Sequence, residues 1–247
     1  MRPSRTVTGI IFLKGLSSII AQTLLLRELL VVFYGNELVL GILLAVWLAS
    51  GSAGNQLAKH RGDSAQHPRR DYGLFLILST IWMPLAILFI RLSRLAWGVG
   101  DGEAFGLGAI VISSVIALAV PAFCDGAMFS RGLRLMGSIA RLYSWEAAGL
   151  IAGGLAFTFF LMPCVNALAI TFFLGTVNMI GLWILERREG AGRLKNTVTI
   201  VLAACLIGLA ASEPLHRKTI EMQWRNRSIA AYRNSAGGNI VALKEKN

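Results

Sequence analysis

The stretch GLSSIIAQTLLLRELLVVFYGNELVLGILLAVWLASGSAG, residues 15–54, decides the fold. It holds two apolar runs of membrane-spanning length, hinged at Tyr34-Gly35-Asn36-Glu37. The first run carries Arg27 and Glu28 inside it, although ionisable side chains are costly in hydrocarbon. With Glu37 at the hinge, this pair is expected either to cap a helical hairpin near the membrane surface or to line a polar site between helices.

The rest of the chain repeats this pattern. Of its 247 residues, 55% are hydrophobic and only 15% are charged, which argues against a soluble core. Runs such as residues 38–48 are apolar on every face, unlike the alternating strands of a membrane barrel. We therefore predict an all-α, polytopic transmembrane bundle of about seven helices over residues 1–211, with a short basic polar tail over residues 212–247. The expected helices are 7–33, 37–58, 72–90, 105–123, 144–162, 165–185 and 197–211; without the last and shortest, six remain.

The formal net charge of +11 lies mainly in the connections. Basic residues cluster at the N-terminus and after the second, fourth and sixth expected helices, so the positive-inside rule predicts a cytoplasmic N-terminus. The expected location is the cytoplasmic membrane of a bacterium. The charge is thus a topology signal, and no nucleic-acid partner is predicted. Seven spans would place the tail on the outer side although it is basic, and the sequence leaves that side open.

Several polar residues interrupt the apolar runs. Lys14 and Gln22, with Ser18 between them, share one face of the first helix. Asp125 is expected at the end of the fourth helix and Glu146 near the start of the fifth. These groups are expected either to satisfy one another or to form a cation or amine site between helices one, four and five.

Small residues predict close helix contacts. They are Gly51 and Gly54 at the end of the second helix, and Gly149, Gly153 and Gly154 in the fifth. The histidines and cysteines show no ligand spacing, so no metal site is predicted.

Several motifs together resemble a known family. They are Gly15-Leu16-Ser17-Ser18 through Gln22, Arg27-Glu28-Leu29, Tyr34-Gly35-Asn36-Glu37-Leu38, Pro121-Ala122-Phe123 with Gly126 and Phe129, Arg141-Leu142-Tyr143, residues 149–154, and Leu161-Met162-Pro163. This set resembles the transmembrane domain of membrane-integral, spermidine synthase-like proteins. In the tail, Trp224 and residues 234–241 resemble the entry to that family's soluble aminopropyltransferase domain, although Gly237 stands where an aromatic is usual.

The resemblance implies a membrane module rather than a complete enzyme. The family's catalytic domain resembles a Rossmann-like fold that binds decarboxylated S-adenosylmethionine as cosubstrate, and these residues contain no strand, glycine loop and helix unit of that kind. No catalytic residue and no cofactor is therefore assigned to this chain.

The resemblance and the polar residues leave three functions open. The first is a membrane domain that anchors or assists a separately encoded aminopropyltransferase-like partner. The second is a small transporter for a polyamine or another cation, and the third is a structural subunit of a membrane assembly. The lipid bilayer is the expected surrounding, and a homo-oligomer is left open.

Overall fold

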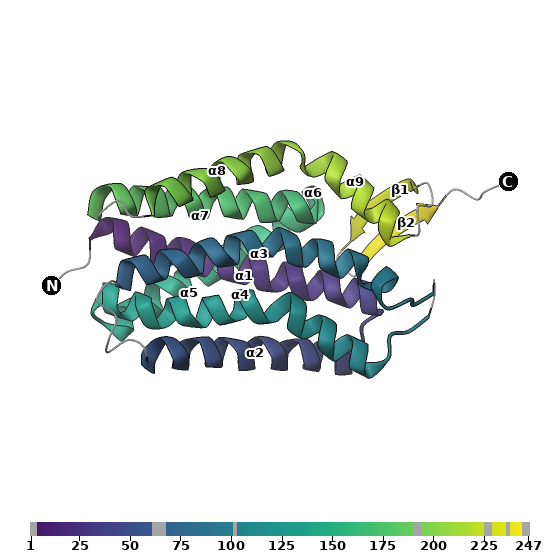
Figure 1. Ribbon diagram of the computed structural model, residues 1–247, viewed down its shortest axis with the longest axis horizontal. Coiled ribbons are helices and arrows are strands. Elements are labelled where there is room, and N and C mark those ends of the chain that lie inside the picture. The colour runs from purple at the N-terminus through teal and green to yellow at the C-terminus, as the bar shows by residue number, and fades with distance from the viewer. Residues whose placement is uncertain are drawn as a thin grey trace.

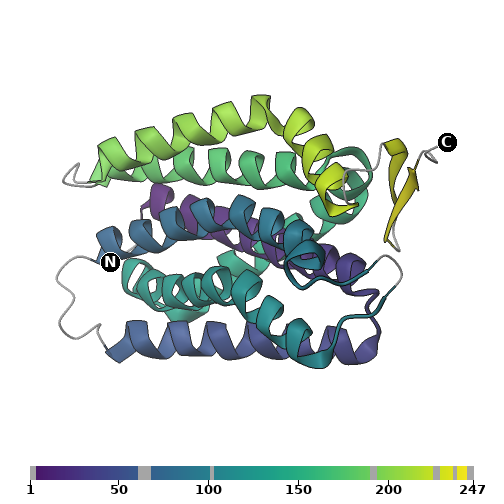
Figure 2. The same cartoon turned by 45° about the vertical axis from the view of Figure 1, so that its right-hand side comes forward.

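The chain folds into an elongated bundle of long helices that lie side by side (Figures 1 and 2). The computed structural model describes residues 4–60, 68–100, 103–189, 194–224, 229–235 and 238–243. Its elements are α1 (Arg5–Phe33), α2 (Glu37–His60), α3 (Pro68–Ala96), α4 (Leu107–Met136), α5 (Ile139–Ala156), the π-helical turn η2 (Phe157–Leu161), α6 (Met162–Cys164), α7 (Ala167–Glu189), α8 (Lys195–Ala210), α9 (Ser212–Gln223), β1 (Ile229–Ser235) and β2 (Gly238–Leu243).

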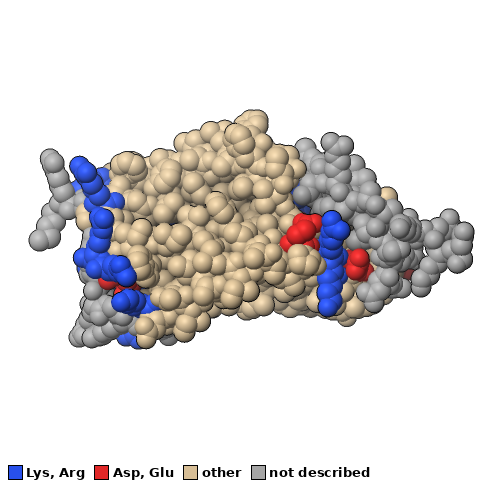
Figure 3. All heavy atoms as spheres, turned by 90° about the horizontal axis from the view of Figure 1, so that it is seen from above, with Lys and Arg blue, Asp and Glu red and all other residues tan. Residues whose placement is uncertain are grey.

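The predicted helical membrane bundle is confirmed. In the described part of the chain, six helices are long and apolar enough to cross a membrane, and α8 with α9 makes a seventh if this pair, bent by 69°, is one span. The outer surface of the bundle carries exposed apolar side chains such as Leu48, Ile151, Phe160 and Ile207, which suit contact with lipid rather than water. Figure 3 shows the resulting broad band without charged side chains.

Charge gathers at the two ends of this band. On the face drawn in Figure 3, Lys and Arg are concentrated at the end where the N-terminus lies. The N-terminus and the α9 and hairpin region lie at opposite ends of the bundle (Figure 1). The tail therefore leaves the bundle at the end away from the N-terminus, as expected for seven crossings.

The tail adds strands that the all-α prediction did not include. β1 and β2 pair antiparallel in a two-stranded sheet, in which Ser235 pairs with Gly238. The sheet lies at one end of the helical bundle (Figures 1 and 2).

Several helices extend beyond their predicted ends. α3 continues past Ile90 to Ala96, α4 continues past Phe123 to Met136, and α5 begins at Ile139 instead of residue 144. The predictions stopped at charged residues, but these helices continue through them. Pro121 also lies inside α4, since proline is tolerated in membrane helices when neighbouring helices support the bend. As a result, Asp125 lies inside α4 and not just after its end.

Glycines hold two pairs of helices at backbone contact. A methyl group on Gly54 of α2 would fall on the carbonyl oxygen of Phe123 in α4, and one on Gly126 would fall on that of Gly51. Gly149 and Gly153 of α5 lie in the same way against Phe12 and Leu16 of α1. Gly154 differs from the expected packing role, because nothing lies within 4 Å of a methyl group placed there.

This difference gives a matched pair of substitutions. Gly149→Ala is expected to lower the free energy of unfolding by about 1–3 kcal/mol, since backbone atoms of α1 must move to admit the methyl group. Gly154→Ala is expected to be neutral or slightly stabilising, because alanine is the better helix former. Thermal unfolding of both variants in detergent micelles measures the difference, and equal losses would contradict the packing role of Gly149.

Candidate functional site

A cluster of three charged side chains lies inside the bundle between α1, α4 and α5. Lys14 Nζ lies 3.0 Å from Asp125 Oδ1 and donates a hydrogen bond to Glu146 Oε1. Lys14 is only 4% exposed, and the Glu146 and Asp125 side chains are 11% and 27% exposed. The sequence placed these residues on the same three helices, and the structure brings them together.

The cluster carries surplus negative charge. When all three groups are ionised, one lysine faces two carboxylates, so one negative charge is uncompensated within the cluster. Glu146 Oε2 is buried and finds no hydrogen-bond partner among the described residues. Because such a charge is costly inside a membrane protein, the cluster favours a bound cation.

An open groove leads to this cluster. It has a volume of about 270 Å³ and is lined by α2, α4 and α5 together with Lys14. Asp125 and Glu146 both reach it, and Trp47 and Phe129 contribute aromatic side chains. The groove thus offers two carboxylates and two aromatic rings to a ligand.

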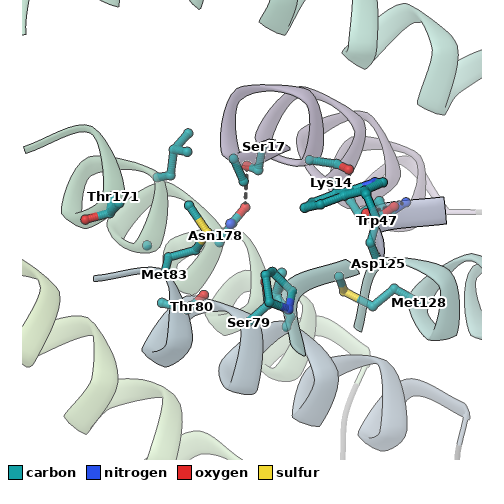
Figure 4. Close-up of a pocket in the computed structure, with 16 residues that line it drawn as sticks. Lys14, Ser17, Trp47, Ser79, Thr80, Met83, Asp125, Met128, Thr171 and Asn178 are labelled. Atoms are coloured by element: carbon teal, nitrogen blue, oxygen red, sulfur yellow. Dashed lines mark hydrogen bonds and ion pairs between the residues drawn. The ribbon is translucent and has the colours of Figure 1, made fainter. Parts of the chain in front are cut away.

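An inner hollow lies on the other side of Lys14. It has a volume of about 40 Å³ and shares Lys14, Trp47 and Asp125 with the groove. Figure 4 shows the side chains around it, with Lys14, Trp47 and Asp125 at one end and Thr171 at the other. Ser18 lines this hollow with Lys14, whereas Gln22, the third member of the expected polar stripe, is half-buried and lines neither space.

A second buried network joins α1, α3 and α9 near the opposite end. Arg91 of α3 is 1% exposed and its Nε donates to Glu28 Oε2 over 3.4 Å. Its Nη1 donates to Thr219 Oγ1 over 2.6 Å, and its Nη2 lies 3.1 Å from His216 Nδ1. Arginine only donates, so Nδ1 of His216 accepts.

The charged residues of the α1–α2 hairpin therefore lie in different surroundings. Glu28 is buried in this network, and Arg27 Nη1 lies 3.9 Å from Glu28 Oε1. Glu37 is exposed in the first turn of α2. The expected place near the membrane surface thus fits Glu37, whereas Glu28 lies between helices.

Sequence reasoning missed the partner of Glu28. The third helix was expected to end at residue 90, and that bound was wrong because Arg91 and Arg94 lie in α3 and are buried. His216 lies beyond the last expected helix, and the structure places it in α9. The available signal was Ile90-Arg91-Leu92-Ser93-Arg94-Leu95, where two arginines three residues apart continue a helical face.

Arg94 closes the same end of the bundle. It donates to the carbonyl oxygen of Val32 over 3.1 Å and to those of Gly100 and Glu103, and it lies over the rings of Tyr34 and Phe105. Tyr34 has a left-handed backbone, with a φ of 50°, where α1 ends. Arg94 therefore fastens the turn between α1 and α2 to the connection that follows α3.

Comparison with known proteins adds no assignment. No protein-family model, curated protein or solved structure matches this chain. Function is therefore argued from the cluster and from the motifs in the sequence.

Proposed function

We propose that this chain is the membrane domain of a spermidine synthase-like protein and that it binds an amine cation at the cluster of Lys14, Asp125 and Glu146. The observation that carries the proposal is the surplus carboxylate charge at an open groove. The motifs of the α1–α2 hairpin and of α4 to α6 support the family. The proposed location is the cytoplasmic membrane of a bacterium, with the N-terminus in the cytoplasm.

The chemistry of the groove favours an organic ammonium over a metal ion. Hard metal ions prefer several oxygen ligands, whereas here Lys14 occupies the space between the two carboxylates. Trp47 and Phe129 line the groove, and aromatic faces attract ammonium groups. The groove, at about 270 Å³, lies just below the usual range for small-molecule sites, which suits a slender amine.

The chain is proposed to assist chemistry performed elsewhere. An aminopropyltransferase-like partner would hold decarboxylated S-adenosylmethionine and the catalytic groups, and this domain would anchor that partner and hold amine within the membrane. α9 and the hairpin lie together at one end of the bundle (Figure 1), which offers a place for such a partner.

Transport of a polyamine or another cation is the second candidate. Its supporting observation is that the groove and the inner hollow share Lys14, Trp47 and Asp125, so polar space continues past the cluster into the bundle. Flux of labelled spermidine into proteoliposomes separates this function from binding without transport.

Amine binding is tested with the purified chain in lipid nanodiscs. Spermidine titrated by calorimetry is expected to bind saturably, and Asp125→Asn and Glu146→Gln are each expected to weaken binding roughly tenfold or more, because each removes a charge-assisted contact. Glu37→Gln is the matched control, since Glu37 is exposed at the far end of α2. Equal affinity in all four proteins, or no saturable binding to the unmodified chain, would overturn the proposal.

A further inference from the structure

The inner hollow is lined by polar groups from three helices. Ser17 of α1 donates to Asn178 Oδ1 of α7 over 2.8 Å, as drawn in Figure 4. Thr80 of α3 also lines the hollow, is 6% exposed, and its Oγ1 finds no hydrogen-bond partner among the described residues. A buried hydroxyl without a partner is costly unless water supplies one.

The hollow has room for that water. A buried water needs about 10–15 Å³ of such space and two to four polar partners. At about 40 Å³ the hollow has room for roughly three waters. The hydroxyls of Ser17, Thr80 and Thr171 and the side chain of Asn178 supply polar partners along its length.

The hollow lies between the groove and a layer of apolar side chains. It covers residues 14–21 of α1, 76–83 of α3 and 171–178 of α7, which is about 10 Å along each helix. Beyond it, toward the end that carries α9, the next turns present the fully buried Leu24, Leu25 and Ile87. On the other side it meets the groove at Lys14 and Asp125.

We propose that the inner hollow is a water-filled chamber that opens toward the groove alone, with the Lys14–Asp125 ion pair as its gate. Water in the chamber hydrates the charged cluster from within the bundle, while the apolar layer beyond it blocks water from the other end. The cluster is then hydrated from one side of the membrane only.

Hydroxyl-radical footprinting by X-ray radiolysis tests this in the unmodified, amine-free protein, so its outcome is independent of amine binding. Met83 and Met128 line the chamber and are 5% and 4% exposed, whereas Met179 and Met136, which are also buried, at 0% and 1%, do not line it. We expect Met83 and Met128 to be oxidised several-fold faster, because bound water generates radicals beside them. Equal rates for all four methionines would overturn the chamber.

The gate has its own test. Asp125→Asn weakens the ion pair with Lys14, so oxidation of Met83 is expected to rise at least twofold while that of Met179 stays unchanged, which also shows that the bundle remains folded. Thr80→Val keeps the shape and removes the hydroxyl, and is expected to slow oxidation of Met83. Unchanged Met83 oxidation in Asp125→Asn would overturn the gate, and unchanged oxidation in Thr80→Val would overturn the role of Thr80 in holding water.

Discussion

Replacing Lys14 with methionine is expected to lower the free energy of unfolding by about 3–5 kcal/mol. The variant leaves Asp125 and Glu146 inside the bundle without their shared cation, and one Glu146 oxygen already has no hydrogen-bond partner among the described residues. For a chain of this size the loss corresponds to a melting temperature lower by roughly 6–20 °C. Thermal unfolding in micelles, followed by intrinsic fluorescence, measures it.

Removing the acids should restore much of that loss. The triple variant Lys14→Met with Asp125→Asn and Glu146→Gln carries no charge at the cluster, so it is expected to melt close to the unmodified protein. Lys59→Met is the control, because Lys59 is exposed near the end of α2 and its loss should change stability by less than about 0.5 kcal/mol. A Lys14→Met variant as stable as Lys59→Met would show that the carboxylates do not depend on Lys14.

Replacing Arg91 with methionine is expected to release α9 from the bundle. Arg91 is the donor that joins Glu28 of α1 to Thr219 and His216 of α9, and breaking a buried pair of this kind costs about 3–5 kcal/mol. Backbone hydrogen exchange over residues 212–223 should accelerate by at least tenfold. Exchange over the apolar part of α3 around Ile87 should change much less.

Two further variants test whether the lost contacts of Arg91 cause the faster exchange in α9. Arg217→Met removes an exposed ion pair with Glu213. The side chains of Arg217 and Glu213 are 76% and 59% exposed, and such pairs contribute little to stability. It should leave exchange in α9 unchanged. Arg91→Met combined with Glu28→Gln should recover bundle stability but not α9 protection, because the contacts to Thr219 and His216 remain absent. Full protection of α9 in Arg91→Met would contradict its role as the link.

The number and order of the long helices could be predicted because hydrocarbon imposes one rule on every segment. The ends of the helices could not be predicted, since a reading based on apolar runs takes each charged residue as a boundary. Arg91 and Asp125 show why: each lies inside a helix and is paired with a residue from a distant part of the chain, and such a partner cannot be seen from the neighbouring sequence.

Some residues of the candidate site could likewise be predicted from the sequence, and others could not. Lys14, Asp125 and Glu146 were visible as costly charges in apolar runs, which must find partners or a ligand. Thr80, Asn178 and Trp47 were not, because hydroxyl, amide and indole groups are common in membrane helices and only packing decides which of them face a cavity.

The glycine contacts divide the bundle mechanically. Backbone contact at Gly149 and Gly153 locks α1 to α5, and contact at Gly54 and Gly126 locks α2 to α4. Each locked pair can move as a rigid body, because at these glycines backbone meets backbone with no side chain between that could repack.

The charged cluster straddles the seam between these two rigid bodies. Lys14 and Glu146 belong to the α1–α5 pair, and Asp125 belongs to the α2–α4 pair. Any shear between the bodies therefore stretches the Lys14–Asp125 contact and leaves the Lys14–Glu146 contact intact, so a small sliding motion is converted into an asymmetric redistribution of charge.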